Sequence, residues 1–434
     1  MGSRKEGEQF ASVNGSYWRI IMSENLTSID KKSVSADQAE KIILSQKRDF
    51  GTETISFRDA VGRVLAQNIV ADRDLPPFDR AAMDGIAIKY EAIEKGVTVF
   101  KIIATQPAGE TPVEAKAIDE CIEIMTGAAR SSTVDTIIRY EDIEIKNGAA
   151  FLLTENIKKG QNIHRKGSDK KQNEILAEAD FIVTPSVINA AASVGVKDLE
   201  VKKLPEVVFI STGDEIVDID TKPSPYQIRN SNAYSIEAVL KQHAIQPSLL
   251  HLPDDKEMIK EKIKQCFDDY DVLILSGGVS MGKFDYLPKV LEELSVQKLF
   301  YKVQQRPGKP FWFGSYENKL IFAFPGNPVS AFLCLHRYFL PWLRSCLSIS
   351  LKSMYAVLDE DIEFKPSLTY FLQVKLQMSE QGKLLAQPIK GNGSGDFSSL
   401  VKADAFIELP SDKFFFQKGE VYKLWMINKN FPAK

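Results

Sequence analysis

Short apolar runs alternate with helix-forming stretches between residues 205 and 346. The runs 207–210 and 271–275 lack the polar alternation of a half-exposed strand, which is typical of strands buried on both faces of a sheet. Helices are predicted over 233–243, 255–269, 285–294 and, as one long apolar helix, over 328–346. Strands and helices in this alternation form a doubly wound, largely parallel sheet. Residues 205–350 are therefore expected to form an α/β domain.

The chain has a different pattern on either side of this segment. From about 79 to 164, β-branched runs such as 97–103 and 136–140 are separated by Gly, Pro and Asn, which predicts a small, mostly β module. After residue 350 no helix is expected, and alternating segments such as 370–376 predict a terminal β-barrel. The fold class is therefore multidomain, with α/β and β parts.

The N-terminal region contains one clear helix signal. Ser35 is followed three residues later by Gln38, which predicts a capping box at the start of a helix over 35–48. Residues 1–21 have neither the apolar core nor the cleavage site of a secretory signal, and Met22 opens a more ordinary start. We expect residues 1–21 to be a disordered leader or a misplaced start.

Composition excludes several classes of partner. The 434 residues suggest about three domains at roughly 100–200 residues each. With 55 Lys and Arg against 58 Asp and Glu, the net charge is −3, so no nucleic-acid or membrane partner is expected. The four cysteines lack CxxC spacing, which argues against structural zinc and disulfides and favours a cytoplasmic location.

A glycine pair follows the predicted strand 271–275. Gly277 and Gly278 would let the backbone approach a ligand and present successive N–H groups, and Ser276 and Ser280 would add hydroxyls. A tight strand-to-helix turn explains the pair equally well. The acidic Asp285 just beyond it favours a ligand site at this strand end, where open α/β sheets bind ligands.

Acidic residues follow two other predicted strands. Glu215 lies just after the run 207–210, and Asp254 lies just after a third apolar run, 248–252. With Asp285 these carboxylates would suit Mg²⁺, which prefers carboxylate and phosphate oxygens. A helix cap with solvated acids is the alternative, and the sequence does not decide whether the three converge.

Three cations lie within eight residues at Lys302, Arg306 and Lys309, around a Pro-Gly turn. Such a group suits phosphate or another oxyanion, although a solvated hairpin is equally consistent with it. Downstream, Pro325 and Pro328 stiffen a loop at another strand end and leave N–H groups for an anion at the helix start. Acids for a metal beside cations for phosphates suit phosphoryl or nucleotide chemistry.

Ligand-like turns also occur in the β module and next to it. Apolar Met83 beside Asp84 is an unusual surface composition unless something docks there. The turns that contain Thr126 and Asp169 similarly follow apolar runs. Each turn alone is better explained as structural.

Taken together, these segments resemble the molybdopterin molybdenumtransferase family, and the matching C-terminal domain of the animal scaffold protein gephyrin. The resemblance runs from about residue 34 to 425 through PPFDRAAMDG, IMTGA, RKGSD, STGDEI, SNAYSIEAVL, LPDD, SGGVSMGKFDY, RPGKP and FPGNPVSAF. Each motif is weak alone, but nine motifs in order are specific.

The resemblance implies a particular domain plan. It comprises an elongated linker domain (22–78 plus 165–204), an inserted β domain (79–164), an α/β molybdopterin-binding-like domain (205–350) and a C-terminal β-barrel (351–434). The family works as a homodimer whose active cleft is built between subunits. The turns in the β module would then serve the α/β domain of the partner.

The resemblance also implies an activity, which is Mg²⁺-dependent insertion of molybdenum from molybdate into adenylylated molybdopterin with release of AMP. The molybdopterin adenylyltransferase is a further implied partner. The implied catalytic residues are Asp84, Thr126, Asp169, Glu215 and Asp285, and the implied metal ligands are Glu215, Asp254 and Asp285. The implied substrate-binding residues are Ser276, Gly277, Gly278, Ser280, Lys302, Arg306, Lys309, Pro325, Pro328 and Ser330.

The chain departs from the family pattern at two motifs. Arg306 stands where the family usually has lysine, and Arg80-Ala81-Ala82 stands where Asn-Ser-Ala is commoner. A diverged paralogue, a tungstate-specific homologue and a scaffold of the same fold remain alternatives. The related adenylyltransferase and the competence-damage amidohydrolases share the α/β domain but not the other motifs.

Overall fold

The computed structural model describes residues 33–279, 285–350 and 352–428. The chain divides into two compact units, of which the first contains residues up to Thr52 and from Lys202 onward, and the second contains Glu53–Val201. None of the helices in the described ranges combines the length and apolar character that a membrane crossing needs. The expected leader, residues 1–21, lies outside the described residues.

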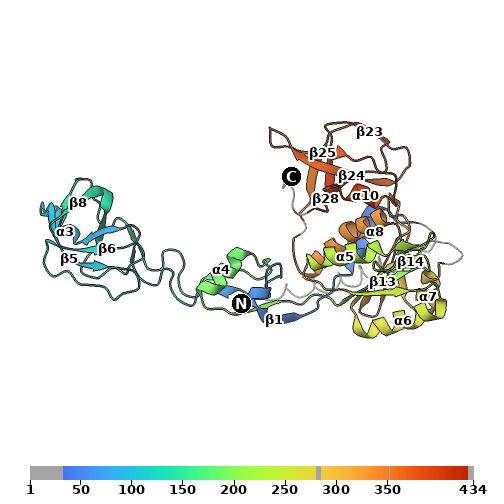
Figure 1. The fold of residues 1–434 in the computed structure, drawn as a ribbon, viewed down its shortest axis with the longest axis horizontal. Helices are drawn as coiled ribbons and strands as arrows, with labels where there is room; N and C mark the ends of the chain where they lie inside the picture. The colour runs from blue at the N-terminus through green and yellow to red at the C-terminus, as the bar shows by residue number, and fades with distance from the viewer. Residues whose placement is uncertain (1–32, 280–284, 351, 429–434) are drawn as a thin grey trace, which may run out of the picture. The chain divides into compact units, whose positions relative to one another are not determined.

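The first unit contains a six-stranded sheet in the order β16-β13-β17-β21-β20-β18. Its strand β13 is labelled in Figure 1. The first four strands of the sheet are mutually parallel, β20 runs antiparallel to β21, and β18 runs antiparallel to β20. The predicted doubly wound, largely parallel sheet is thereby confirmed. The strands are β16 (Ser248–Leu252), β13 (Val207–Thr212), β17 (Val272–Ser276), β21 (Lys319–Phe324), β20 (Trp312–Tyr316) and β18 (Gln297–Tyr301).

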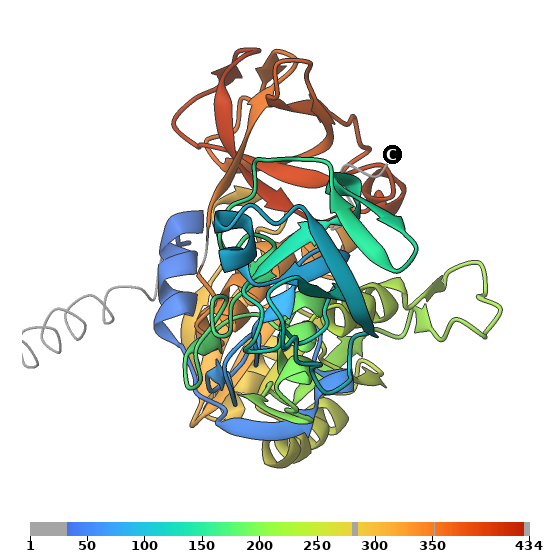
Figure 2. The same ribbon diagram turned by 90° about the vertical axis from the view of Figure 1, so that its left-hand side faces the viewer.

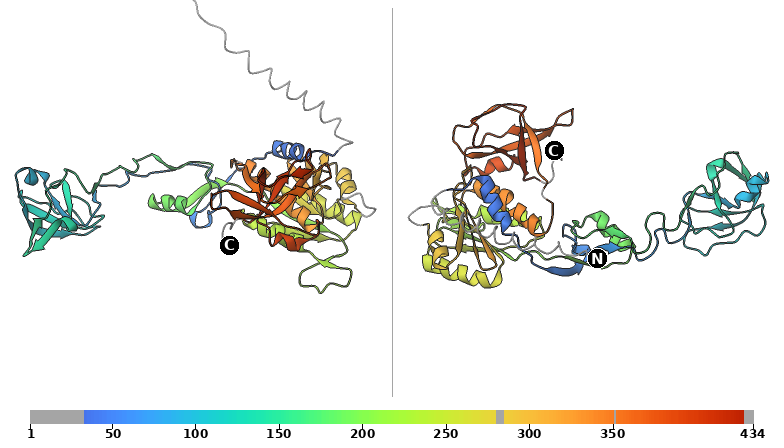
Figure 3. Two further views of the ribbon diagram at one scale, coloured as in Figure 1. Left: turned by 90° about the horizontal axis from the view of Figure 1, so that it is seen from above. Right: turned by 180° about the vertical axis from the view of Figure 1, so that it is seen from behind.

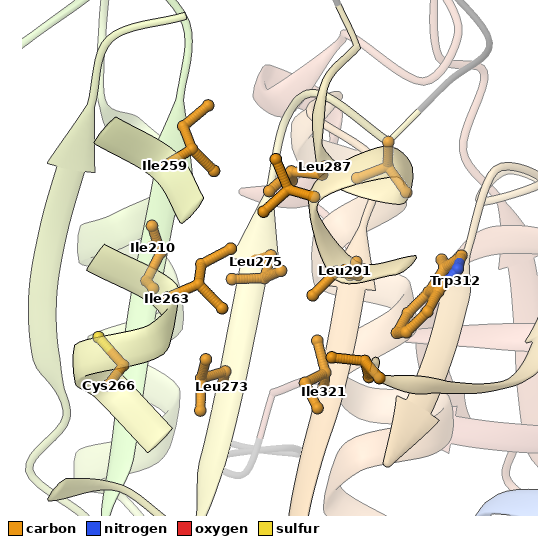
Figure 4. Close-up of a cluster of buried hydrophobic side chains, with 14 of the residues drawn as sticks. Ile210, Ile259, Ile263, Cys266, Leu273, Leu275, Leu287, Leu291, Trp312 and Ile321 are labelled. Atoms are coloured by element: carbon orange, nitrogen blue, oxygen red, sulfur yellow. The ribbon is translucent and has the colours of Figure 1, made fainter. Parts of the chain in front are cut away.

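Helices cover both faces of this sheet. Helices α6 (Lys256–Asp269) and α7 (Leu287–Glu293) pack together on one face, and α5 (Ser231–Lys241) and α8 (Pro328–Cys334) contact strands β13 and β21. Figure 4 shows the apolar contact under α6 and α7, where their side chains meet those of the central strands. All six residues of β13 are buried, as expected for a strand covered on both faces. Each buried Leu or Ile contributes about 1.5–3 kcal/mol.

The helix predicted over 328–346 is not one continuous α-helix. It consists of α8, a π-helical segment η4 (Leu335–Phe339) and α9 (Leu340–Cys346). Pro341 has no N–H, and its ring would clash with the carbonyl group four residues earlier. The helical turn before Pro341 therefore includes one extra residue, as in a π-helix, and the Leu340 N–H donates to the Leu335 carbonyl.

Helix α2 (Ala36–Ser45) confirms the predicted capping box. The Ser35 hydroxyl accepts from the Gln38 N–H, and the Gln38 side chain accepts from the Ser35 N–H. The helix packs against α9 (Figure 3), and the Trp342 indole N–H donates to the Gln46 carbonyl at 2.9 Å. This helix therefore belongs to the first unit, although the family resemblance assigned it to the linker domain. The five expected domain boundaries stay predictions.

The C-terminal part of the first unit is a closed ring of five strands (Figure 2). The ring runs through β24 (Thr369–Met378), β25 (Leu384–Pro388), β22 (Met354–Leu358), β28 (Val421–Met426) and β26 (Ala405–Leu409), which pairs again with β24. This confirms the predicted barrel. A short helix, α10 (Phe397–Leu400), lies where no helix was expected. Smaller pairs in this unit are β14 (Ile216–Val217) with β15 (Ile228–Arg229), β23 (Ile362–Glu363) with β27 (Phe415–Phe416), and β19 (Gln305–Arg306) with β24.

The second unit contains its own six-stranded sheet, in the order β7-β4-β6-β5-β9-β8. These strands are β7 (Thr136–Arg139), β4 (Gly85–Ile88), β6 (Glu120–Ile124), β5 (Val99–Gln106), β9 (Ala149–Leu152) and β8 (Ile143–Lys146). Short ladders join β3 (Arg80–Ala81) to β10 (Ile163–His164) and β2 (Ile69–Val70) to β11 (Ile175–Ala177). Strand β1 (Thr52–Ser56) pairs with β12 (Asp198–Lys202), and the remaining elements are η2 (Phe57–Asp59), α3 (Tyr90–Glu94), η3 (Tyr140–Asp142) and α4 (Pro185–Ser193).

Candidate functional site

A cavity of about 350 Å³ lies at the carboxyl ends of β13, β17 and β21. We call it the acidic pocket, because Glu215 and Asp285 lie in its wall. It brings together seven of the residues predicted from the sequence: Glu215, Ser276, Gly277, Gly278, Asp285, Pro325 and Pro328. The position matches the rule that ligands bind beyond the carboxyl ends of parallel strands.

The glycine pair in this pocket is required by the backbone. Gly277 and Gly278 have φ values of 96° and 58°, which residues with a side chain rarely adopt. A Cβ atom on Gly277 would lie 2.5 Å from the Thr212 carbonyl oxygen, and one on Gly278 would lie 2.9 Å from the Thr212 Oγ1. The ends of β13 and β17 therefore lie so close together that only glycine fits at positions 277 and 278.

The Ser276 hydroxyl is used within the protein. Asn232 Nδ2 donates to Ser276 Oγ at 3.2 Å, and the hydroxyl donates to the Pro325 carbonyl at 3.4 Å. Asn232 also donates to the Gly326 carbonyl at 2.7 Å. Ser276 and Asn232 therefore hold the 325–328 loop beside the glycine pair.

The predicted acids are neighbours, but they do not form a complete metal site. Burial raises the pKa of Asp254, and the negative charges of Asp214, Glu215 and Asp285 raise it further. The Asp254 N–H also donates to Asp214 Oδ1 at 3.1 Å. Among the described residues, no group of three or more His, Cys, Asp or Glu side chains is arranged to hold a metal ion. The convergence of Glu215, Asp254 and Asp285 on one ion stays a prediction.

A second cavity, of about 630 Å³, adjoins the first. We call it the cationic pocket, because it is lined by Arg306 and Lys309, together with Ser330. Pro325 and Asn327 line both cavities, so the 325–328 loop forms the wall between them. In the part of the chain that the structure describes, neither Arg306 nor Lys309 has an ion-pair partner, so their charges face the cavity unopposed.

A buried network supports the turn that carries these cations. Tyr338 donates a short hydrogen bond to Gln305 Oε1, and Gln305 Nε2 donates to the Gly308 carbonyl at 3.2 Å. Gln305 and Tyr338 are each about 1% exposed. The buried hydrogen bonds of Gln305 and Tyr338 therefore fix the position of the 306–309 turn.

Two of the predicted substrate-binding residues, Lys302 and Ser280, are not among the described residues that line the two cavities, and their roles stay predictions. Lys302 lines neither cavity, and its Nζ lies 5.0 Å from the centre of the Tyr301 ring. Ser280 lies outside the described residues. The N–H group of Val329 donates to the Ser394 carbonyl at 3.1 Å. This N–H at the start of α8, which the sequence suggested for an anion, is therefore occupied.

The remaining predicted residues belong to the second unit. Asp84 Oδ1 accepts from the Thr126 N–H at 2.6 Å and from its hydroxyl at 2.7 Å, and these bonds lower the pKa of Asp84. Asp169 Oδ1 lies 2.7 Å from His164 Nε2. The structure therefore joins Asp84 with Thr126 and gives Asp169 a histidine partner that had no motif in the sequence.

Several residues that line the two pockets lie outside the motifs identified in the sequence. The hydroxyl of Thr212, in the acidic pocket, is buried without a hydrogen-bond partner in the described structure, as is Gln373 Oε1 in the cationic pocket. The barrel loop Gly391–Gly395 forms a further wall of the cationic pocket. Its Gly-rich sequence is the one signal that could have indicated it, since glycines favour close approach to a ligand.

Three known protein families match successive parts of the chain. They are the MoeA N-terminal region (domain I and II) at residues 34–195, a probable molybdopterin binding domain at 208–345, and the MoeA C-terminal region (domain IV) at 355–426. Together they extend over most of the length of the chain.

Whole-chain relatives agree with these matches. A molybdopterin molybdenumtransferase of Synechocystis sp. is 38% identical over 396 residues, which are 90% of this chain and 99% of that protein. The enzyme of the same name from Bacillus subtilis is 29% identical over 91% of this chain and 94% of its own. A crystal structure of the molybdopterin biosynthesis moeA protein from Pyrococcus horikoshii superimposes with a TM-score of 0.77 at 27% identity, covering 91% of this chain and all of that one. With its three regions in order and its relatives matched over nearly their whole length, the chain belongs to the molybdopterin molybdenumtransferase family.

Proposed function

We propose that the protein inserts molybdenum from molybdate into adenylylated molybdopterin and releases AMP in a Mg²⁺-dependent reaction. The names of the relatives support a role in molybdenum cofactor biosynthesis. The observation that carries the proposal is the pair of adjoining cavities, one with acids and one with cations, on either side of the 325–328 loop.

The acidic pocket suits the nucleotide end of the substrate. Its glycine pair admits close approach of phosphate groups, and its carboxylates face the same space. Glu215, Asp254 and Asp285 provide only hard oxygen donors, a set that fits Mg²⁺ when substrate phosphates complete the shell. When bound there, the ion would neutralise phosphate charge during cleavage of the phosphoanhydride bond.

The cationic pocket suits an oxyanion. Arg306 and Lys309 supply positive charge without a competing carboxylate, and the Ser330 hydroxyl lies in the same wall. Molybdate placed there would lie next to the bound pterin nucleotide, because the two cavities share Pro325 and Asn327. Tungstate has the same charge and nearly the same size, so both oxyanions belong in the assay.

The test is reconstitution with purified protein. Adenylylated molybdopterin, Mg²⁺ and molybdate, or tungstate in a parallel arm, are mixed with the protein, and AMP release and activation of an apo-molybdoenzyme are measured. Asp285→Asn should fold normally, because Asp285 lies in a cavity wall and not in the core, and should lose AMP release by about two orders of magnitude or more. The exposed Asp220→Asn is the matched control. Wild-type turnover by Asp285→Asn would remove that carboxylate from the site.

A further inference from the structure

Arg80 and His164 lie directly opposite each other in the short ladder of β3 and β10. Arg80 Nη2 is 3.4 Å from His164 Nδ1, and His164 Nε2 is 2.7 Å from Asp169 Oδ1. The imidazole therefore bridges an arginine and a carboxylate. Arg80 is also the residue at which the chain departs from the usual asparagine of the first motif.

The partners of His164 determine which of its nitrogens carries the hydrogen. A guanidinium group can only donate hydrogen bonds, so Nδ1 must accept from Arg80. The hydrogen is then on Nε2, which donates to Asp169. Asp169 thereby fixes the neutral tautomer that can hold Arg80, and the imidazole has no ring nitrogen left to act on a ligand.

Arg80 differs from the other arginines near it. Arg130 and Arg165 both bind Asp79, at 2.6 and 3.2 Å. Arg80 has no carboxylate within ion-pairing distance among residues 33–279, 285–350 and 352–428, and its one described side-chain partner is His164. Most of its five N–H donors therefore remain available for an external acceptor.

The backbone places Arg80 beside the Asp84 and Thr126 pair. The N–H of Ala81 donates to the Ala128 carbonyl, and the N–H of Gly127 donates to the Ala81 carbonyl, each at 2.9 Å. These bonds tie β3 to the turn that contains Thr126. The backbone of Arg80, whose guanidinium group is held by His164, thus lies beside the turn that contains a residue already expected in the site.

We propose that Arg80 binds a phosphoryl oxyanion and that His164 is a positioning residue that aims it. The planar fork of a guanidinium matches phosphate oxygens in a bidentate contact, which favours this class of ligand. The inference rests on the proposed function in taking the diphosphate of the adenylylated substrate as the source of the oxyanion.

Binding can be tested without turnover. The chain has only four histidines, so histidine labelled with ¹³C at Cδ2 and Cε1 gives four sets of NMR signals in the full-length protein. His164 reports on Arg80. His251 reports on the acidic pocket, because its Nδ1 lies 3.0 Å from the hydroxyl of Ser211 in that pocket. The probe is ADP with MgCl₂, and adenosine is the control that lacks phosphate.

We expect the Cδ2 shift of His164 to identify the Nε2–H tautomer, and ADP but not adenosine to move its signals. Arg80→Gln should abolish that response, whereas Arg73→Gln should leave it unchanged, because Arg73 is an exposed arginine 4.0 Å from Asp72.

A response of His251 without one of His164 would overturn the role of Arg80 and still support nucleotide binding in the acidic pocket. A response of His164 alone would support Arg80 and contradict the nucleotide site. An equal response of His164 to adenosine, or in Arg80→Gln, would overturn the inference.

Kinetics separate positioning from folding. Arg80→Gln should raise the KM for adenylylated molybdopterin by about tenfold and change kcat by less than about twofold, because a binding contact is lost. His164→Phe should have the same effect, and the double variant should be no worse than either, because the two residues act as one unit. His164→Asn, which keeps a carbonyl acceptor near the position of Nδ1, should restore part of the affinity. Additive losses in the double variant would show that His164 does not act through Arg80.

Discussion

The carboxylate of Asp79 accepts charge-assisted hydrogen bonds from three donors. Arg130 Nη2 lies 2.6 Å from Oδ2, Arg165 Nη1 lies 3.2 Å from the same oxygen, and the Lys166 N–H donates to Oδ1 at 2.8 Å. Burial raises the pKa of Asp79, but the Lys166 N–H and the two arginines lower it by more, so it lies below the ordinary value of 3.8. A depressed carboxyl pKa stabilises the folded state above the unfolded value, and this contribution is lost as the pH falls through the folded value.

Asp79→Asn should therefore lower the free energy of unfolding by about 1.5–3 kcal/mol at pH 7, since it removes hydrogen bonds to a charged group. The difference from wild type should shrink as the pH falls below 3.8. Urea titrations over a range of pH measure both effects. Asp72→Asn is the control, because Asp72 is exposed and lies 4.0 Å from its arginine. A loss that stayed constant with pH would show that the charge of Asp79 is not what stabilises the fold.

The cations of the first unit should differ in their importance. Lys309 lines the cationic pocket and Lys302 does not, so Lys309→Ala should weaken molybdate binding more than Lys302→Ala. The loss should be larger at low salt, where screening is weak. Arg306→Lys should be mild, because it restores the residue usual in the family and keeps the charge. Titration calorimetry at two ionic strengths measures this, and loss of binding in Arg306→Lys would mean that a bidentate arginine contact is essential.

At the scale of elements, the π-helical segment η4 carries a buried arginine between three parts of the first unit. Arg337 is fully buried, and Nη2 donates to Glu40 of α2 at 3.0 Å and to Glu408 of β26 at 3.4 Å. Its guanidinium carbon lies 4.2 Å from the centre of the Trp425 ring on β28. Burial lowers the pKa of Arg337, but the charges of Glu408 and Glu40 more than compensate and the pKa is raised.

Arg337→Met should destabilise the protein by about 3–5 kcal/mol, because it leaves two carboxylates without their cation. Adding Glu40→Gln and Glu408→Gln to Arg337→Met should recover part of this loss, since the unpaired charges are then gone. Chemical denaturation of the wild type, Arg337→Met and the triple variant measures the loss and its recovery. Arg344→Met on α9 is the control for loss of an arginine charge and should be close to neutral, because Arg344 is exposed and makes no ion pair among the described residues. No recovery of stability in the triple variant would show that packing, and not charge pairing, is what Arg337 supplies.

Local patterns predicted the elements better than the contacts between them. The runs 207–210 and 271–275 correspond to β13 and β17, in which every residue is buried, because continuous apolar burial is a property of neighbouring residues. The π-helical segment was not predicted, because Pro341 lies inside an apolar run that was expected to form one continuous helix. The pairing of His164 with Arg80 and the wall at Gly391–Gly395 depend on residues about 60 to 85 positions apart, which no local period encodes.

At the scale of the whole molecule, the expected catalytic residues are divided between the two units. Glu215 and Asp285 belong to the first unit, and Asp84, Thr126 and Asp169 belong to the second. The family resemblance implies a homodimer in which the second unit of one subunit serves the first unit of its partner. A two-fold interface of this kind would give each dimer two equivalent sites, each built from both chains.

Mixing two inactive variants tests this arrangement. Asp84→Asn and Asp285→Asn are co-expressed with different affinity tags, so that doubly tagged heterodimers can be isolated. If each site uses Asp84 of one chain and Asp285 of the other, a heterodimer has one site with both lesions and one with neither. Random pairing makes half of the dimers mixed, so the unfractionated mixture should show about a quarter of wild-type AMP release. Heterodimers purified by both tags should show about half, whereas each variant alone stays inactive. Doubly tagged heterodimers without activity would place Asp84 and Asp285 in a site of the same chain.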